Sequence, residues 1–271
     1  YAKYSFLFFS LLNKISNSSA MIFNASYNVS LSFWSLFIEF LYLSLIIFFS
    51  SSTLSREVGQ TEITTDEGIE VFQNEKYYLL KNNVQIISDD FQLDADLVKA
   101  YFEKNMYDIV KIECEGSVVL TSSKGVIAKG QKLNFSPKNE DIVILGINSS
   151  LIYDKLNMQS DGLIEVNNIN GKFNLNGKNS ELKNDSIQII GDAIKGEYKT
   201  INGINEVINL IVTDSNIANI ITEKLNMFAI KATYFKDKNL IELFGNVKVI
   251  TDNEIILGDH AKINTLTQSY K

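Results

Sequence analysis

Apolar and polar residues alternate along most of the chain, in short runs that are separated by polar, turn-forming residues. Three runs carry aliphatic side chains at every second position: Val84 and Ile86, Val118 and Leu120, and Val247 and Val249. Alternation with a period of two places one set of side chains on one face of a β-sheet. The pattern therefore predicts an all-β body over residues 60–271.

The three runs also begin alike, which indicates an internal repeat. Their openings are Asn82-Asn83, Gly116-Ser117 and Gly245-Asn246, and Asp96, Gly130 and Asp259 follow fourteen positions later (82 to 96, 116 to 130, 245 to 259). Asn and Gly accept positive φ, so we expect each opening to be a turn ahead of a strand. Candidate strands recur about every 8–12 residues. The repeat weakens between residues 147 and 225, but no linker interrupts it, which favours one continuous stack.

Residues 1–59 differ in kind from this body. The stretch from Leu31 to Phe49 is apolar apart from serines and Glu39, and it is long enough to cross the core of a bilayer. The small residues Ser50-Ser51-Ser52-Thr53 follow it, and they are of the kind that a signal peptidase accepts. We therefore expect residues 1–59 to form a hydrophobic helix that is either a cleaved signal sequence or a retained membrane anchor. Both alternatives export residues 60–271.

Charge and side-chain chemistry limit the possible functions. The formal net charge is −7 and Lys and Arg form no cluster, so nucleic-acid binding is not expected. We expect the one cysteine, Cys114, to be a buried small hydrophobe on the same strand face as Ile112. The one histidine, His260, is expected in an exposed loop, with no nearby Cys or His to share a metal. The sequence predicts no metal site and no cofactor.

Candidate catalytic residues are equally sparse. The sequence has neither a Ser-His-Asp set nor a Gly-rich phosphate-binding loop. Asp89-Asp90 and the pair Asp94 and Asp96 have the composition of calcium ligands or glycosidase acids, but polar turn positions explain them more simply. We therefore predict that the protein is not an enzyme.

Six segments of the body are similar to a known family: Ile63–Glu70, Tyr77–Val84, Leu93–Phe102, Glu115–Leu120, Phe244–Val249 and Gly258–Ala261. They resemble the OstA-like family of periplasmic lipopolysaccharide-transport proteins, whose type member is LptA. The last three resemble the recurring Gly-Asn-Val and Gly-Asp-x-Ala elements of the family. Gly130-Gln131 departs from Gly-Asp, and the middle third of the body matches poorly.

The resemblance implies an open β-jellyroll over residues 60–271, V-shaped in section, in which antiparallel strands stack like a solenoid. It implies a periplasmic protein of outer-membrane biogenesis that holds the acyl chains of lipopolysaccharide in an apolar groove and passes them from the inner to the outer membrane. Copies of the chain, and transport proteins of both membranes, would join end to end by edge-strand pairing. The alternation assigns nine residues to the inward, lipid-binding face: Val84, Ile86, Leu93, Val118, Leu120, Ile127, Val247, Val249 and Ile256.

Three other interpretations stay open. The first is an inner-membrane-anchored β-jellyroll component of the same export machinery (LptC-like), with residues 1–59 retained. The second is a parallel β-helix that acts on polysaccharide, which requires exposed carboxylates and aromatic residues clustered in one groove. The third is an outer-membrane barrel, which requires strands of about ten residues with aromatic girdles; the expected strands are too short and too charged for it.

Overall fold

The computed structural model describes residues 60–105, 108–267 and 269–271, which belong to one compact unit, Arg56–Lys271. Every regular element assigned in this part of the chain is a β-strand. The prediction of an all-β body is therefore confirmed for these residues. The strands are β1 (Glu62–Thr64), β2 (Ile69–Phe72), β3 (Tyr77–Ile87), β4 (Phe91–Phe102), β5 (Ile109–Ser122), β6 (Val126–Ser136), β7 (Asp141–Leu145), β8 (Ser149–Tyr153), β9 (Leu156–Ser160), β10 (Leu163–Asn167), β11 (Lys172–Lys183), β12 (Ile187–Ile201), β13 (Ile204–Thr222), β14 (Asn226–Phe235), β15 (Leu240–Ile250) and β16 (Ile255–Asn264).

The hydrophobic helix expected in residues 1–59 lies outside the described residues. The choice between a signal sequence and a membrane anchor, and the domain boundary after residue 59, therefore stay predictions. Among the described residues, no helix has the length and hydropathy of a membrane span.

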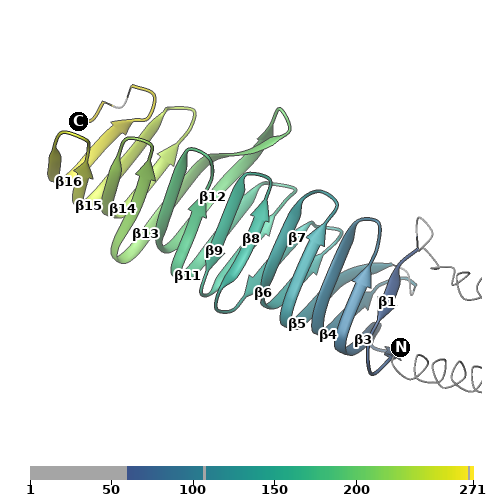
Figure 1. The fold of residues 1–271 in the computed structure, drawn as a ribbon. Helices are drawn as coiled ribbons and strands as arrows, with labels where there is room; N and C mark the ends of the chain where they lie inside the picture. The colour runs from purple at the N-terminus through teal and green to yellow at the C-terminus, as the bar shows by residue number, and fades with distance from the viewer. Residues whose placement is uncertain (1–59, 106–107, 268) are drawn as a thin grey trace, which may run out of the picture. The chain divides into compact units, whose positions relative to one another are not determined.

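The strands form a single antiparallel sheet of 16 strands. Its order is β1-β3-β4-β5-β6-β7-β10-β11-β12-β13-β14-β15-β16, so most sequence neighbours are also neighbours in space. β2 pairs with β3 beside β1, while β8 and β9 pair with each other between β6 and β11. Figure 1 shows the chain zigzagging from β1 at one end of this body to β16 at the other. The sheet runs through residues 147–225 without interruption, although the repeat weakens there in sequence.

Each long strand bends near its middle, and the bends fold the sheet along its length into two halves. The bends coincide with register shifts, for example between Lys81 and Val84 in β3 and between Glu115 and Val118 in β5. We call the half that contains residues 77–81 of β3 the first half-sheet, and the half that contains residues 84–87 the second. Two bent strands are each divided into two short strands: β7 and β8 form one, and β9 and β10 form the other. β7 pairs with β10 in the first half-sheet, and β8 pairs with β9 in the second.

The repeated Asn and Gly pairs lie at these bends. Positive φ angles occur at Asn82 and Asn83 (61° and 50°), at Gly116 and Ser117 (77° and 45°), and at Gly245 and Asn246 (76° and 50°). The prediction that these pairs are turns ahead of separate strands is therefore wrong. Two consecutive left-handed residues make a bulge that redirects the strand, but the chain continues in pairing with the same neighbour. The strands are accordingly longer than the spacing of the apolar runs suggested.

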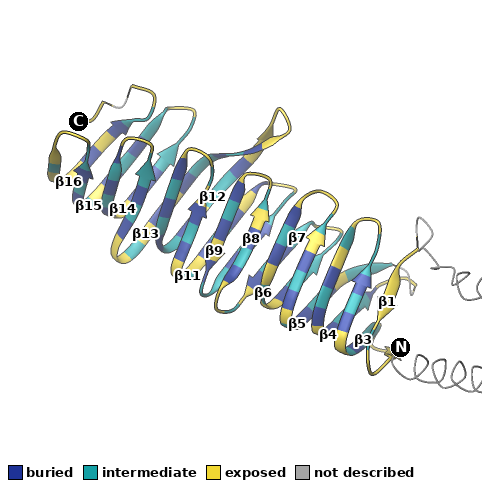
Figure 2. Ribbon diagram, in the orientation of Figure 1, coloured by how far each residue is buried: buried dark blue, intermediate teal, exposed yellow. Residues whose placement is uncertain are grey.

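The two half-sheets face each other and enclose one continuous hydrophobic core, which draws residues from β3 to β16. Figure 2 shows buried residues alternating with intermediate or exposed residues along the strands, as expected for a sheet with one inward face. The long edge opposite the bends, where hairpin turns of the two half-sheets approach each other, is called the mouth. Near the N-terminal end of the body, the rings of Phe91 and Phe135 meet across the mouth with their centroids 6.4 Å apart.

Candidate functional site

Most of the residues predicted for the lipid-binding face do lie together inside the second half-sheet. Seven of the nine are at most 5% exposed: Val84, Ile86, Leu93, Val118, Leu120, Val247 and Val249. Ile86 lies opposite Leu93, and Leu93 lies opposite Leu120, so these side chains form a row across β3, β4 and β5. Ile256 lies opposite Val249 and packs partly buried against the core, because β16 is the last strand in the order of the sheet.

Ile127 is the exception, because it faces outward. Its neighbours Val126 and Ala128 are buried, whereas its cross-strand partners Thr121 and Ile152 are exposed. The prediction that Ile127 belongs to the inward face is therefore wrong. Three consecutive apolar residues fit either phase of a two-residue period, and the alternation alone could not choose between them.

The predicted face is packed against other side chains. Val118 and Val84 are each 1% exposed, so solvent does not reach this part of the face. A ligand could reach these side chains only if the half-sheets moved apart.

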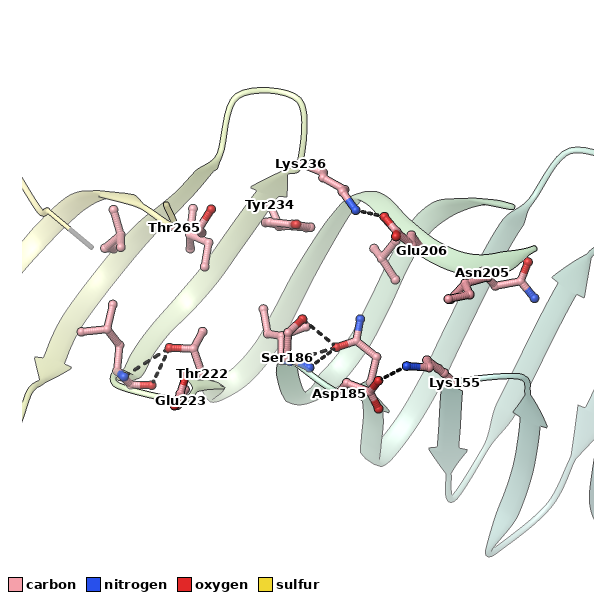
Figure 3. Close-up of a pocket in the computed structure, with 17 residues that line it drawn as sticks. Lys155, Asp185, Ser186, Asn205, Glu206, Thr222, Glu223, Tyr234, Lys236 and Thr265 are labelled. Atoms are coloured by element: carbon pink, nitrogen blue, oxygen red, sulfur yellow. Dashed lines mark hydrogen bonds and ion pairs between the residues drawn. The ribbon is translucent and has the colours of Figure 1, made fainter. Parts of the chain in front are cut away.

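The interior opens at a different place, in the mouth over β12–β16. A cavity of about 740 Å³ lies there, between the ends of the two half-sheets. Figure 3 shows its two rims: one carries Asn205, Glu206, Tyr234, Lys236 and Thr265, and the other carries Lys155, Asp185, Ser186, Thr222 and Glu223. Such a volume is within the usual range of small-molecule sites.

The inner wall of the cavity is apolar. It consists of Ile187 and Leu225 from the second half-sheet, and of Val207, Ile241 and Ile263 from the first. All five belong to the continuous core of the body, so the cavity gives access from solvent to the same interior that the alternation predicted. Sequence reasoning missed these residues because it followed the apolar runs near the bends and did not consider the strand ends at the mouth.

Charged residues on the rims are mostly paired with each other. Lys155 forms an ion pair with Asp185 on one rim, and Lys236 forms one with Glu206 on the other. The hydrogen bond that Lys155 donates to the carboxylate of Asp185 raises the pKa of Lys155, which keeps that side chain protonated. With Glu223 included, the lining carries two cationic and three anionic side chains. The site therefore lacks the excess of positive charge that would hold an anionic group strongly.

Neither Cys114 nor His260 is among the residues that line the cavity. Cys114 is buried, and desolvation raises the pKa of its thiol to about 12, so it is neutral and shielded at physiological pH. His260 lies in strand β16, so the prediction of a loop position is wrong, although the residue is exposed as expected. Its ring stacks on that of Phe244, with the two centroids 4.9 Å apart. Among the described residues, no group of three or more His, Cys, Asp and Glu side chains is arranged to hold a metal.

The four aspartates considered as catalytic or calcium-binding candidates have separate positions. Asp89 and Asp90 lie in the turn between β3 and β4. Asp94 accepts hydrogen bonds from Gln85 and Gln92 on the sheet surface. Asp96 lies in the bend of β4, against Gly116.

No protein-family profile matches the chain, and no match is found among curated protein sequences. Among solved structures, the chain is similar to the crystal structure of LptH from Pseudomonas aeruginosa, described as the LptA homologous periplasmic component of the conserved lipopolysaccharide transport device. The alignment has 11% identity and a TM-score of 0.35, and it covers 40% of this chain and 76% of LptH.

Proposed function

We propose that this protein is a non-enzymatic lipid carrier, which holds the apolar chains of its cargo inside the folded sheet and takes them in through the mouth over β12–β16. The observation that carries this proposal is the cavity of about 740 Å³, whose inner wall is continuous with the apolar core. Lipopolysaccharide is the cargo that the resemblance in sequence implies.

The energetics favour an apolar chain as the bound group. Burial of one methylene contributes about 0.8 kcal/mol, so ten methylenes would contribute about 8 kcal/mol before the ordering costs of binding. The rims offer little to an anionic headgroup, because Lys155 and Lys236 are already paired. The headgroup and sugars would therefore remain in solvent, which suits a protein that must pass its cargo on.

The two ends of the sheet suit partners that add a strand. At one end, the outer edge is formed by β1 and β2, where Ile63 and Val71 are exposed. At the other end, Ile255 and Leu257 of β16 are 61% and 73% exposed. Exposed strand edges are templates for pairing. We propose that copies of this protein, and inner- and outer-membrane transport proteins, join at these edges in the periplasm.

The half-sheets differ at the β16 end. In the first half-sheet, Lys262 and Lys271 exchange backbone hydrogen bonds of 2.9 Å in both directions, so this part of β16 already has a partner segment. Residues 255–258, in the second half-sheet, have no further strand beside them among the described residues. A docking strand would therefore pair first with residues 255–258.

The alternative of an inner-membrane-anchored component differs from the carrier only in the fate of residues 1–59. Both have the same body and the same cavity. Amino-terminal sequencing of the mature protein distinguishes them, because a cleaved signal removes the apolar stretch from Leu31 to Phe49 and an anchor retains it.

Site-specific photo-crosslinking tests the proposed function. A photoreactive residue at Val207 or Leu225, in the cavity wall, should capture lipopolysaccharide added in detergent micelles. A matched position is Lys248, whose neighbours Val247 and Val249 are buried while it faces the opposite side of the sheet. Equal capture from Lys248 and Leu225 would refute binding in the interior. Capture at Val118, in the packed region, would require separation of the half-sheets and should be weaker.

A further inference from the structure

The hairpin that joins β12 and β13 extends beyond its neighbours in the first half-sheet. From Ala193↔Thr213 to Ile201↔Ile204 this hairpin has nine residue pairs, whereas β14 and β15 have five in the same half-sheet. The pairing of β11 with β12 reaches only Glu197, and that of β13 with β14 only Asn209. Residues 198–207 therefore project past the sheet, and we call them the hairpin arm. Figure 1 shows it rising beyond the adjacent turns.

A bulge at the base of the hairpin arm directs it across the mouth. The register shifts between Glu197 and Tyr198, where Ile208 is the extra residue of the opposite strand. Such a bulge bends a hairpin and re-aims it. The arm consequently meets the second half-sheet: the backbone N–H of Asn205 donates to Oδ2 of Asp154 at 3.0 Å. The rings of Tyr198 and Tyr153 also meet edge to face, with their centroids 6.0 Å apart.

The hairpin arm forms one end of the cavity. Ile204, Asn205, Glu206 and Val207 line it, together with Lys155, which follows Asp154 in the turn between β8 and β9. In Figure 3, Asn205 and Lys155 mark this end from opposite rims. Asn205 is only 5% exposed, so its contact with Asp154 closes the mouth at the point where the cavity stops.

We propose that the hairpin arm is a latch, which opens at its basal bulge to let an apolar chain enter the cavity and pass toward β11. This inference depends on the lipid-carrier function proposed above. Opening would break the bond to Asp154 and expose Asn205 and Val207, which are 5% and 3% exposed. Among the described residues, the arm has no neighbouring strand beyond Glu197 and Asn209, and Asp154 supplies a hydrogen bond across the mouth. The tip residues Ile201 and Ile204 are exposed, so opening does not require extraction of the tip from the core.

The base of the hairpin arm would stay fixed when its tip moves. Tyr198 donates its backbone N–H to the carbonyl of Gly171 at 2.8 Å and its hydroxyl to Oδ1 of Asn168 at 2.6 Å, both in the first half-sheet. The ion pair between Glu206 and Lys236 also lies within the first half-sheet. Asn205, near the tip, makes the hydrogen bond to Asp154 across the mouth, whereas Tyr198, at the base, packs against Tyr153. Loss of the bond to Asp154 would therefore release the tip while the base stays held.

The test compares two variants that each remove one carboxylate. Asp154→Ala removes the acceptor of the bond across the mouth, whereas Asp252→Ala removes an exposed carboxylate in the turn between β15 and β16, which does not line the cavity. Hydrogen exchange of the amides of residues 199–206 measures opening, and stopped-flow binding of the neutral apolar probe N-phenylnaphthylamine measures entry. We expect Asp154→Ala to increase both rates by roughly tenfold, as for loss of one charge-assisted hydrogen bond. Asp252→Ala should change neither rate.

Each result has a distinct meaning. Arm amides that exchange at the same rate in both variants would overturn the latch. Faster exchange without faster probe entry would overturn its role as a gate, while the lipid-carrier function would stand. Absence of probe binding in the wild-type protein would instead refute the carrier, and the gate with it. A shortened arm, in which Asn202-Gly203 joins Lys199 directly to Glu206, should reproduce the fast entry of Asp154→Ala.

Discussion

The carboxylate of Asp161 accepts a hydrogen bond from the backbone N–H of Asn148, with 3.1 Å between the nitrogen and Oδ1. The side-chain amide of Asn179 donates to its other oxygen at 2.6 Å. Asn148, Asp161 and Asn179 lie in the bends of three adjacent strands, and Asn148 and Asn179 have positive φ. One carboxylate thus holds three bends together and satisfies an amide that the bend withdraws from the sheet ladder.

Replacement of Asp161 should therefore destabilise the protein at the bends of these three strands. We expect Asp161→Ala to unfold at a lower urea concentration than the wild-type protein, because the Asn148 amide loses its partner. Asp185→Ala, at an exposed turn of the mouth, is the control and should leave the midpoint unchanged. A midpoint for Asp161→Ala equal to that of the control would mean that water replaces the carboxylate at no cost.

The same interactions make stability depend on pH. The hydrogen bond from Asn179, followed by that from Asn148, lowers the pKa of Asp161 below its ordinary value of 3.8. Hydrogen bonds from the hydroxyl and the backbone N–H of Ser215 likewise lower the pKa of Asp192. A carboxyl whose pKa is lower in the folded state stabilises fully above its unfolded pKa, and this contribution is lost as pH falls through the folded pKa.

Acid should consequently weaken the wild-type protein more than a variant that cannot titrate at these two bends. We expect the urea midpoint of the wild type to fall more steeply from about pH 5 to about pH 2 than that of Asp161→Asn/Asp192→Asn. Other carboxylates titrate in both proteins, so the difference between the curves reports these two residues. Parallel curves would contradict the proposed linkage.

The alternation of apolar residues was sufficient to predict the sheet and most of its inward face. Val84 and Val247 lie in strict two-residue patterns, and both are buried. Ile127 was misassigned because Val126, Ile127 and Ala128 are all apolar. Packing decides such cases, and a local pattern does not contain that information.

The bends were misinterpreted for a different reason. Gly-Asn and Asn-Asn pairs are compatible with a tight turn and with a bulge, since both need positive φ. The two differ in whether the flanking residues pair with each other, and here Lys81 and Val84 both pair with β4. The cavity was also beyond prediction, because it depends on how far hairpins such as β12–β13 extend relative to their neighbours.

Gly116 should tolerate no side chain, because its bend is both left-handed and crowded. Its φ is +77°, and a Cβ at this position would lie 2.1 Å from Oδ2 of Asp96. Gly125 has a φ of +81° with open space around it, so it isolates the cost of the backbone conformation. We expect Gly125→Ala to cost about 1–2 kcal/mol and Gly116→Ala to cost more. Equal losses in chemical denaturation would show that Asp96 moves aside freely.

Cys114 should report on separation of the half-sheets. The thiol is 1% exposed and its pKa is raised to about 12, so it should resist Ellman's reagent in the folded protein and react on unfolding. Cys114→Ser would bury a hydroxyl among apolar side chains, and we expect it to cost about 1–3 kcal/mol of stability. Rapid reaction of the native protein would indicate that the body opens without a ligand.

Leu225 should be needed for binding of apolar ligands, because it lies in the wall of the cavity. Leu225→Asp places a charge where the bound chain would lie, and we expect it to weaken binding of N-phenylnaphthylamine by about tenfold or more. Lys224→Asp introduces the same side chain one position earlier, at an exposed residue of the same turn, so it controls for added negative charge. Fluorescence titration gives both affinities, and the thermal midpoint of each variant verifies that it is folded. If the two variants bind the probe equally well, the probe occupies another surface and the cavity is not the point of entry. If only Leu225→Asp is impaired while remaining folded, the apolar wall over β12–β16 is the surface that the ligand contacts.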